Sequence, residues 1–408
     1  MVEIIADLQI HSKHSRATSK DLSFESLEKY ARIKGISLLG VGDFQHPIHR
    51  KEISLKLKED KNGILWSKTK FPFLWQTEVS LMFSQGGKRR AVHLLIFAPN
   101  GNVADKIISY LGSKGRLDYD GRPIFGITAR DLVKDLKEIN DMIEIIPAHC
   151  MTPWFGLFGS KGGFDSLAEC FLDQTDKIYA VESGISASPD MLWRFEEIAN
   201  GNVRVVSFSD AHSYWPWRIG RESTIFNFDE LSYENIIKAI RTGDGLKATI
   251  ETPPEYGKYH YDGHRNCNFS CNPTKTKELN GICPKCGNPL IIGVDYRVEE
   301  IAKHKSGFKP KNPVLFHKIL PLHELIVLVT GLGISSKGNW EIYNPLIEKF
   351  GNELDILLKV SKEALMMEDV NAKLIDLIIK NRDGKIKINP GYDGEYGVAV
   401  LEQQKKLF

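Results

Sequence analysis

Histidine and carboxylate residues recur where strand-like segments of the first half of the chain end. Imidazole nitrogens and carboxylate oxygens are the usual protein ligands of zinc, iron and manganese. Because alternate residues of a strand face the same way, His212 can share one ion with Asp210, and position 9 can share one with His11. The recurring residues, in chain order, are Asp7, His11, Asp43, Glu78, His93, His149, Asp210 and His212.

These residues favour a hydrolytic metal site when they are taken as a group. Clustered metal ions lower the pKa of a bound water and stabilise the charge that develops on a phosphoryl group. A single member such as His93, on an apolar strand, is more simply explained as a hydrogen-bonded core residue. For the same reason His14, His46 and His49 are not assigned as ligands.

Four cysteines lie close together, in a CxxxC pair followed by a CxxC pair. Cys267, Cys271, Cys283 and Cys286 have the spacing of a structural zinc site. Two roles remain open for this module. It can stabilise a small insert whose own core is too small, or it can hold a DNA-binding ribbon, as the basic residues nearby suggest. These basic residues are Lys275, Lys277, Lys285 and Arg297.

The elements that must position these residues alternate between strand and helix. Such alternation is typical of an α/β fold with a parallel sheet or a barrel of βα units, which build their sites at the carboxyl ends of strands. Strands are expected at 2–8, 36–41, 73–79, 91–97, 142–147, 177–181 and 203–208. Helices are expected at 24–34, 128–139, 189–199 and 233–241, and in the last part of the chain at 322–330, 340–350 and 371–380.

The length of 408 residues predicts more than one domain. We expect a metallohydrolase barrel at 1–250, a zinc module at 251–310, a helical carboxyl-terminal domain at 311–400 and a tail at 401–408. The net charge of +2 does not by itself indicate nucleic-acid binding. No apolar run is long enough to cross a membrane and no secretory signal is recognisable, so we expect a cytoplasmic protein with no membrane partner.

The ordered ligand set resembles the PHP (polymerase and histidinol phosphatase) family, and the wider sequence is similar to endonuclease Q. The similarity runs through nearly the whole chain. It is carried by PAH at 147–149, TPWFG at 152–156, GSK at 159–161, GFDSL at 163–167, EYGKYHYDGHRNC at 255–267 and PGYDGEYG at 390–397.

This resemblance implies a distorted (β/α) PHP-type barrel with two or three catalytic divalent metals (Zn²⁺, Mg²⁺ or Mn²⁺), besides the structural Zn²⁺. It implies His11, Glu78, His93, His149, Asp210 and His212 as metal ligands, with Asp210, Glu78 and His149 catalytic. Two departures stand out. Gln9 replaces the first histidine of the usual His-x-His, and an amide is a weak ligand, so one metal is expected to bind loosely or be missing. Asp43 precedes Phe44, where many PHP proteins carry Asp-His, and we keep Asp43 as a ligand.

The implied activity is cleavage of damaged DNA immediately 5′ to hypoxanthine, uracil, xanthine or an abasic site. A damaged or mispaired base costs least to extrude from the stack, which gives part of the selectivity a physical origin. Aromatic and basic side chains suit stacking on bases and pairing with phosphates. The residues expected to contact DNA are Trp154, Phe155, Lys161, Lys258, His260, Tyr261, His264 and Arg265.

The chain ends with an apolar pair in a charged terminus. Gln404, Leu407 and Phe408 have the spacing of the short motif that docks into the sliding clamp of bacteria, so the clamp is an expected partner. A clamp tether raises the local concentration of an enzyme on DNA.

Two alternatives stay open from the sequence. One is a PHP phosphatase or an exonuclease without lesion specificity, although phosphatases need neither a zinc module nor a clamp motif. The other is a catalytically inactive DNA-binding adaptor at the clamp, which Gln9 keeps possible.

Overall fold

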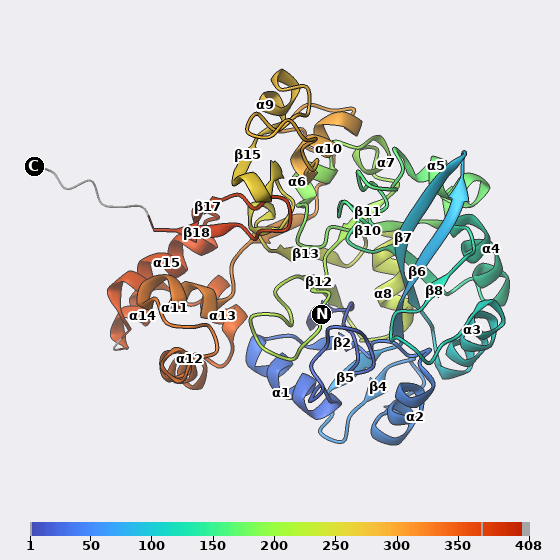
Figure 1. Ribbon diagram of the computed structural model, residues 1–408. Coiled ribbons are helices and arrows are strands. Elements are labelled where there is room, and N and C mark those ends of the chain that lie inside the picture. Colours follow the sequence, from blue (N-terminus) through green and yellow to red (C-terminus); the bar gives the residue numbers. More distant parts are fainter. Residues whose placement is uncertain (1, 369, 402–408) are drawn as a thin grey trace, which may run out of the picture.

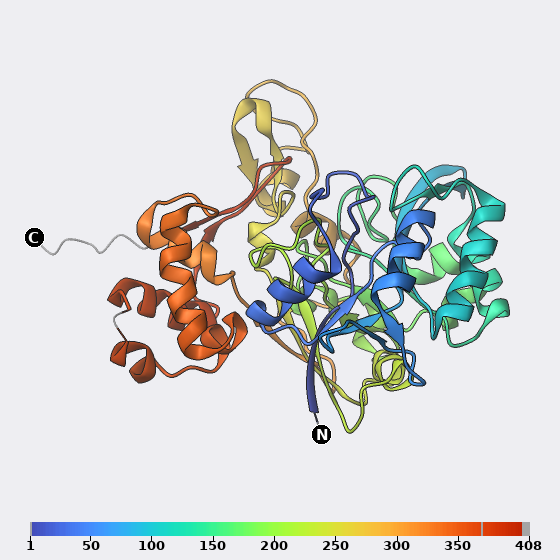
Figure 2. The same ribbon diagram turned by 90° about the horizontal axis from the view of Figure 1, so that it is seen from below.

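The chain folds into a large mixed α/β body, a small cysteine-containing module and a helical carboxyl-terminal region (Figures 1 and 2). The structure is a computed structural model, and it describes residues 2–368 and 370–401. Within those residues, no helix combines the length and the apolar character that a membrane span requires.

An eight-stranded sheet forms the centre of the large body, in the order β16-β13-β12-β1-β2-β5-β4-β3. β1 lies between β2, its parallel neighbour, and β12, its antiparallel neighbour. The strands are β1 (Val2–Asp7), β2 (Leu38–Gly40), β3 (Lys58–Glu59), β4 (Leu65–Trp66), β5 (Pro72–Leu74), β12 (Ser223–Phe228), β13 (Leu246–Glu251) and β16 (Leu315–Lys318).

A second sheet, in the order β8-β6-β7-β9, supplies other candidate ligands. Its centre is a long antiparallel hairpin in which Gln85 pairs with Lys88. Gly86 and Gly87 form the two-residue turn with φ values of 60° and 72°, a conformation that glycine adopts readily. The strands are β6 (Gln76–Gln85), β7 (Lys88–Phe97), β8 (Ile124–Phe125) and β9 (Glu144–Pro147), and a separate parallel pair consists of β10 (Ala180–Glu182) and β11 (Arg204–Val206).

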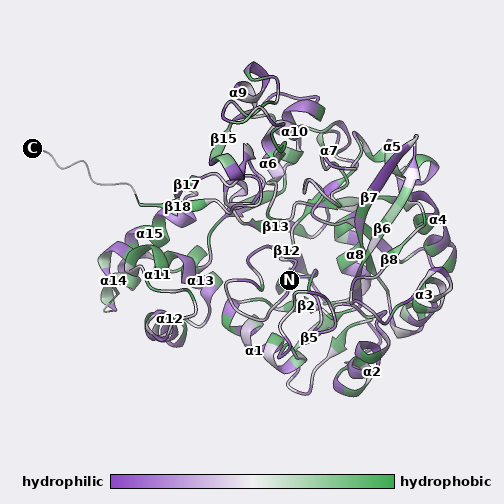
Figure 3. Cartoon of the chain, viewed as in Figure 1, coloured by the Kyte–Doolittle hydropathy of each residue, from purple (hydrophilic) through white to green (hydrophobic). Residues whose placement is uncertain are grey.

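Three of the four helices predicted for the large body match α1, α4 and α8 to within one residue at each end, whereas α2, α3 and α5 were not predicted. Ser23 caps α1 and Thr128 caps α4, while Gly35 ends α1 with a φ of 100°. Figure 3 shows hydrophobic and hydrophilic residues alternating along α4, where Leu132, Val133 and Leu136 are buried. The helices are α1 (Phe24–Lys34), α2 (Pro47–Lys56), α3 (Gly101–Lys114), α4 (Ala129–Ile139), α5 (Leu167–Phe171), α6 (Pro189–Leu192), α7 (Glu196–Ala199) and α8 (Tyr233–Thr242), and the 3-10 turn Leu172–Lys177 follows α5.

Both of these sheets contain antiparallel as well as parallel pairs, which differs from the parallel sheet that was one of the two arrangements expected. The glycine pair at 86–87 makes a hairpin, and hairpins join antiparallel strands. The single strand expected at 73–79 is two strands, β5 and β6, in different sheets, and they are separated at Trp75. The single helix expected at 189–199 is likewise two short helices, α6 and α7.

The cysteine-containing module projects from the large body and contacts a loop of the last segment (Figure 1). Its β14 (Asp262–His264) and β15 (Phe269–Cys271) form a two-stranded sheet, and the Tyr261 N–H donates to the carbonyl of Gly391 at 3.0 Å. The module also contains α9 (Pro273–Glu278), α10 (Val294–Ile301) and 3-10 turns at Pro254–Tyr256 and Arg265–Cys267.

The carboxyl-terminal region is helical, as predicted, but the chain first returns to the main sheet. β16 pairs in parallel with β13, so residues 315–318 of the predicted helical domain belong to the large body. The region comprises α11 (Leu322–Thr330), α12 (Lys337–Phe350), α13 (Glu353–Leu358), α14 (Lys362–Met367), α15 (Ala372–Arg382) and the hairpin of β17 (Lys387–Asn389) and β18 (Val398–Val400).

Candidate active site

Two segments that carry candidate ligands, the one after β1 and the one after β11, meet at an isolated parallel bridge between Ile10 and Ala211. The His11 N–H donates to the carbonyl of Ala211 at 3.0 Å, and the Ala211 N–H donates to the carbonyl of Gln9 at 3.3 Å. Two segments far apart in the chain are thereby aligned, so that Asp210 and His212 face His11.

Glu78 lies at the centre of the site, with each carboxylate oxygen facing a different group of residues. Its Oε2 is 3.0 Å from His11 Nε2, and its Oε1 is 2.8 Å from His93 Nδ1 and 3.4 Å from His149 Nε2. The carboxylate is fully buried. It therefore has the geometry of a carboxylate that can bridge two ions.

The candidate ligands fall into two groups. Within each group, the donor atoms lie within 4.8 Å of one another. One group is His11, Asp210 and His212, and the other is Glu78, His93 and His149. Imidazole and carboxylate donors in such groups fit zinc or manganese. The structure thus brings together all six residues that the family resemblance implies as ligands.

Asp43 lies beside His11 and orients it. The Asp43 Oδ1 is 2.9 Å from His11 Nδ1, while Oδ2 accepts from the Ser12 N–H at 2.6 Å and from the Ser15 hydroxyl at 2.9 Å. Because the carboxylate binds the nitrogen of His11 that faces away from Glu78, it fixes the ring and its tautomer. This geometry is that of a carboxylate behind a ligating histidine.

Three of the site residues have backbone conformations in the left-handed region. The φ values are 40° at Asp43, 31° at His149 and 49° at Asp210. Non-glycine residues in such conformations cost of order 1–3 kcal/mol and gather at functional sites. At His149 the conformation is held by two contacts, since its N–H donates to Glu182 and its Nδ1 lies 2.9 Å from the Thr152 hydroxyl.

The electrostatics of the site favour ionised carboxylates next to histidines. Burial opposes ionisation of Glu78, but the charge of Arg122 and hydrogen bonds from His11 and His149 outweigh it and hold the pKa of Glu78 well below the usual range. Burial lowers the pKa of His93 to about 4, so that imidazole is neutral at pH 7. Burial also disfavours protonated His11, yet Asp43 and the neighbouring carboxylates raise its pKa well above the usual value. A carboxylate-rich cluster of this kind attracts cations.

Gln9 occupies the position beside these groups where a histidine is usual. Its Nε2 donates to Glu78 Oε2 at 3.0 Å, and its buried Oε1 has no hydrogen-bond partner. A buried amide oxygen without a partner costs about 1–3 kcal/mol. That oxygen is therefore available to a cation, although an amide is a weaker ligand than an imidazole.

Arg122 is a residue of the site that the sequence did not indicate. Its Nη1 lies 3.3 Å from Glu78 Oε1, and its side chain is 29% exposed. No motif marks it, because it comes from the irregular segment before β8 and not from the end of a strand. It is a cationic group that reaches solvent at the edge of the cluster.

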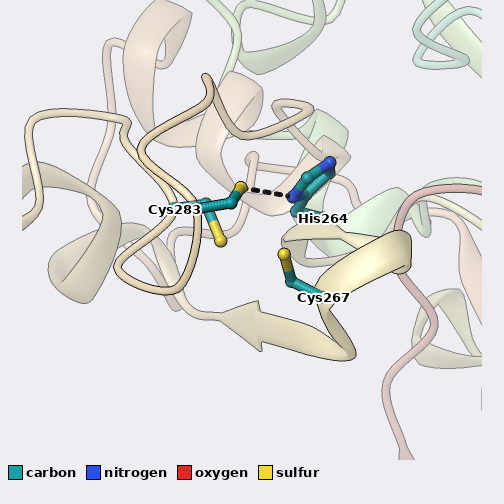
Figure 4. Close-up of side chains that lie close together, drawn as sticks. His264, Cys267 and Cys283 are labelled. Carbon is teal, nitrogen blue, oxygen red and sulfur yellow. Dashed lines mark hydrogen bonds between the residues drawn. The ribbon is translucent and has the colours of Figure 1, made fainter.

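The cysteine cluster has a different membership from the predicted one. The donor atoms of Cys267, Cys283 and Cys286 lie within 4.8 Å of one another and of a nitrogen of His264 (Figure 4). His264 Nδ1 is 3.2 Å from Cys286 Sγ. Three thiols and an imidazole at this spacing fit a tetrahedral zinc site.

Cys271 is near this cluster but is not one of the four grouped residues. It packs in the same small apolar cluster as Cys283 and Leu290, and its Sγ is 3.2 Å from the Thr276 hydroxyl. Of the basic residues near the module, Lys275, Lys277 and Lys285 are exposed. Arg297 is only 8% exposed and donates to the carbonyls of Phe158 and Phe164, so it is a structural residue that joins α10 to the loop after His149.

The residues expected to contact DNA have different environments. Trp154 is 42% exposed and meets the Tyr259 ring edge-to-face at 5.1 Å, whereas the Phe155 ring stacks on His93 at 4.4 Å. His260 is 8% exposed and stacks on Tyr261, which is half-buried. Exposed side chains belong to Lys161, Lys258 and Arg265, while His264 lies in the cysteine cluster. Gln404, Leu407 and Phe408 lie outside the described residues.

Sequence comparisons connect the chain to two uncharacterised proteins. Residues 321–385 match the model of the MJ0043 C-terminal domain. The chain is 36% identical over 262 residues to MJ0043 of Methanocaldococcus jannaschii, a match that covers 63% of the chain and 32% of that protein. The chain therefore spans about a third of MJ0043. It is 28% identical to YqxK of Bacillus subtilis over 97% of the chain and 99% of YqxK.

Two solved structures resemble the whole chain. The lesion-specific endonuclease PfuEndoQ from Pyrococcus furiosus superposes with a TM-score of 0.88 at 30% identity, covering 99% of this chain and 98% of that one. An endonuclease Q complex with a 27-mer duplex carrying an abasic lesion at the active site superposes with a TM-score of 0.87, also at 30% identity, covering 98% of this chain and 97% of that one.

Proposed function

The chain belongs to the endonuclease Q family and is a DNA-repair endonuclease, and from this premise we propose that it cuts immediately 5′ to deaminated bases and abasic sites. The deaminated bases are hypoxanthine, uracil and xanthine, and the cut leaves a 3′ hydroxyl. The abasic lesion in the active site of the similar endonuclease Q complex supports the choice of substrate class.

The observation that carries the proposal is the position of Glu78 between two groups of ligand-type side chains. Glu78 Oε2 is 3.0 Å from His11 and Oε1 is 2.8 Å from His93, which supports a multinuclear site in a distorted PHP-type barrel. The partner-free oxygen of Gln9 and the convergence of Asp210 on His11 also fit bound cations. His11, Glu78, His93, His149, Asp210 and His212 would hold two or three divalent ions.

When bound, the ions supply a hydroxide near neutral pH and offset the charge on the phosphate that is attacked. The chain's own residues hold and orient this site. Asp43 keeps His11 in one tautomer, and Thr152 with Glu182 holds His149. Arg122, partly exposed at the edge of the cluster, would pair with an oxygen of the phosphate next to the lesion.

Selection of damaged DNA requires that the lesion leave the base stack. Extrusion costs a few kcal/mol, and the cost is least at a mispaired, damaged or missing base. The exposed indole of Trp154 and the neighbouring Tyr259 ring offer a surface on which a displaced base can stack. Lys161, on the same loop as Trp154, is exposed and suits a contact with the DNA backbone.

The cysteine module extends the DNA-binding surface in this proposal. His264, Cys267, Cys283 and Cys286 would hold the structural zinc ion. The exposed Lys275, Lys277 and Lys285, with Lys258 and Arg265, would contact phosphates. Gln404, Leu407 and Phe408 would dock the enzyme on the sliding clamp, a proposal that rests on the sequence of the tail alone.

The test is a cleavage panel on end-labelled 27–40-nucleotide duplexes, a length of about three to four helical turns. Each carries deoxyinosine, deoxyuridine, deoxyxanthosine, an abasic site or no lesion, with Mg²⁺ or Mn²⁺ present. We expect one nick directly 5′ to each lesion, with a product that DNA polymerase can extend from its 3′ hydroxyl. Equal cleavage of the undamaged duplex, or digestion from an end, would instead indicate a nuclease without lesion specificity.

A further inference from the structure

A second cluster of ligand-type side chains lies on the other side of the loop that follows β1. One ring nitrogen each of His14 and His49 and one carboxylate oxygen of Glu52 lie within 4.8 Å of one another. His49 and Glu52 are three positions apart on α2 and therefore share one face of that helix. None of the three belongs to the groups around Glu78.

The hydrogen bond that His49 makes determines which of its nitrogens is available. Its Nε2 lies 2.9 Å from the carbonyl oxygen of Val41. Because a carbonyl only accepts, Nε2 carries the proton and Nδ1 presents a lone pair. The Nδ1 is buried without a hydrogen-bond partner and faces Glu52 Oε2 at 3.9 Å. A ring fixed through its other nitrogen by a backbone carbonyl is the usual arrangement of a metal-binding histidine.

The His14 imidazole is also neutral, and one of its ring nitrogens is available to a metal ion. Its Nε2 is buried without a partner, and its ring stacks on His46 with a centroid distance of 4.4 Å and an angle of 12°. Burial, together with the nearby His46, His49 and Lys13, lowers the pKa of His14 to about 4. At neutral pH this imidazole is therefore unprotonated, as metal binding requires.

The surroundings of Glu52 show that this position accepts a cation. Lys13 Nζ lies 2.9 Å from Glu52 Oε2. Both side chains reach solvent, with exposed fractions of 35% for Lys13 and 20% for Glu52, so the ammonium can move aside. A small pocket of about 10 Å³ is lined by Lys13, Phe24, His49 and Glu52, which is close to the space that one water or ion occupies.

We propose that His14, His49 and Glu52 form an additional metal site that binds Zn²⁺ and leaves one coordination position open to the pocket. Two imidazoles and one carboxylate are a donor set that zinc takes in proteins. The ion would link the loop that carries His11, Ser12 and Ser15 to α2. It would thus stiffen the segment that positions His11.

The test counts zinc ions on the full-length protein. The natural chain and the variants Glu52→Gln and His49→Gln are stripped with a chelator, reloaded with Zn²⁺, desalted and analysed by mass spectrometry of the metal content. His304→Gln is the matched control, because His304 stacks on Phe308 far from α2 in sequence and outside every ligand group among the described residues. We expect each site variant to lose one zinc ion per chain and the control to lose none.

Glu52→Gln decides the outcome if His49→Gln fails to fold, since Glu52 is partly exposed and glutamine has nearly the same shape. Adding Glu52→Gln to Asp210→Ala separates this site from the one around Glu78. The double variant should hold one zinc ion fewer than Asp210→Ala alone. An unchanged zinc count in a folded Glu52→Gln protein would overturn the proposal.

Discussion

Replacing Glu353 by glutamine should strongly destabilise the whole protein, although the two side chains have nearly the same shape. Glu353 is fully buried, and its Oε1 is 2.6 Å from Lys34 Nζ, an ion pair that joins α13 to α1. Its Oε2 accepts from the Tyr343 hydroxyl at 2.7 Å, and its Oε1 also accepts from the Leu322 N–H at 2.9 Å. This carboxylate connects the helical region to the large body.

The magnitude follows from what remains after the substitution. Glutamine keeps an acceptor of the same shape but leaves the ammonium of Lys34, 1% exposed, without a counter-charge. Losing one member of a buried ion pair costs about 3–5 kcal/mol. The total free energy of unfolding of a domain is about 5–15 kcal/mol, so the loss is a large part of it. The retained hydrogen bonds place the expected value near the lower bound, about 3 kcal/mol.

The control is Asp244→Asn, which removes an exposed ion pair with Lys238. The side chain of Lys238 is 58% exposed and that of Asp244 is 71% exposed. Solvent screens such an exposed pair, so its loss should change the free energy of unfolding little. Urea unfolding is followed by tryptophan fluorescence, because Trp217 and Trp340 lie 4.8 and 4.5 Å from the His323 ring at this interface. Circular dichroism provides the second probe. A Glu353→Gln protein within 1 kcal/mol of the natural one, similar to the control, would refute the reasoning.

Four further substitutions test the sites. Gln9→His replaces an amide by an imidazole, and we expect divalent metal to bind roughly tenfold tighter or more in a chelator competition; unchanged affinity would show that position 9 is not a ligand position. His264→Ala should abolish zinc retention by the module, whereas Cys271→Ser should leave it intact; loss of zinc from Cys271→Ser would restore the four-cysteine assignment. Arg122→Gln should lower the nicking rate at saturating metal by about 10²-fold if Arg122 offsets charge on the phosphate, and an unchanged rate constant would exclude that role.

The sequence predicts the elements best where local signals are strong. Ser23 and Gly35 mark both ends of α1, and Thr128 marks the start of α4, because caps depend only on neighbouring backbone groups. The family resemblance implied His11, Glu78 and Asp210 as ligands, and the structure brings them together even though the neighbouring strands β1, β6 and β11 belong to three different sheets.

Other features depend on contacts that no spacing reveals. Asp210 and His212 share a group although they do not lie on a strand, because Asp210 adopts a φ of 49°. His264 enters the cysteine cluster from β14 and not from either cysteine pair, so the cysteine spacing pointed to Cys271 instead. His14 and His49 were set aside individually, and only the packing of the first loop on α2 brings them together. Arg297 counts by sequence among the basic residues near the module, but it is buried and bonds to backbone carbonyls.

The most direct test of the account is nicking of a duplex with a single deoxyinosine by the natural chain and by Asp210→Ala, with Asp244→Asn as the surface control. Asp210 Oδ1 is 3.1 Å from His11 Nε2 in the proposed metal site. Asp244 is an exposed residue that belongs to no ligand group among the described residues. We predict a single nick 5′ to the inosine by the natural chain and the control, and none by Asp210→Ala. Retained nicking by Asp210→Ala would contradict the assignment of the active site.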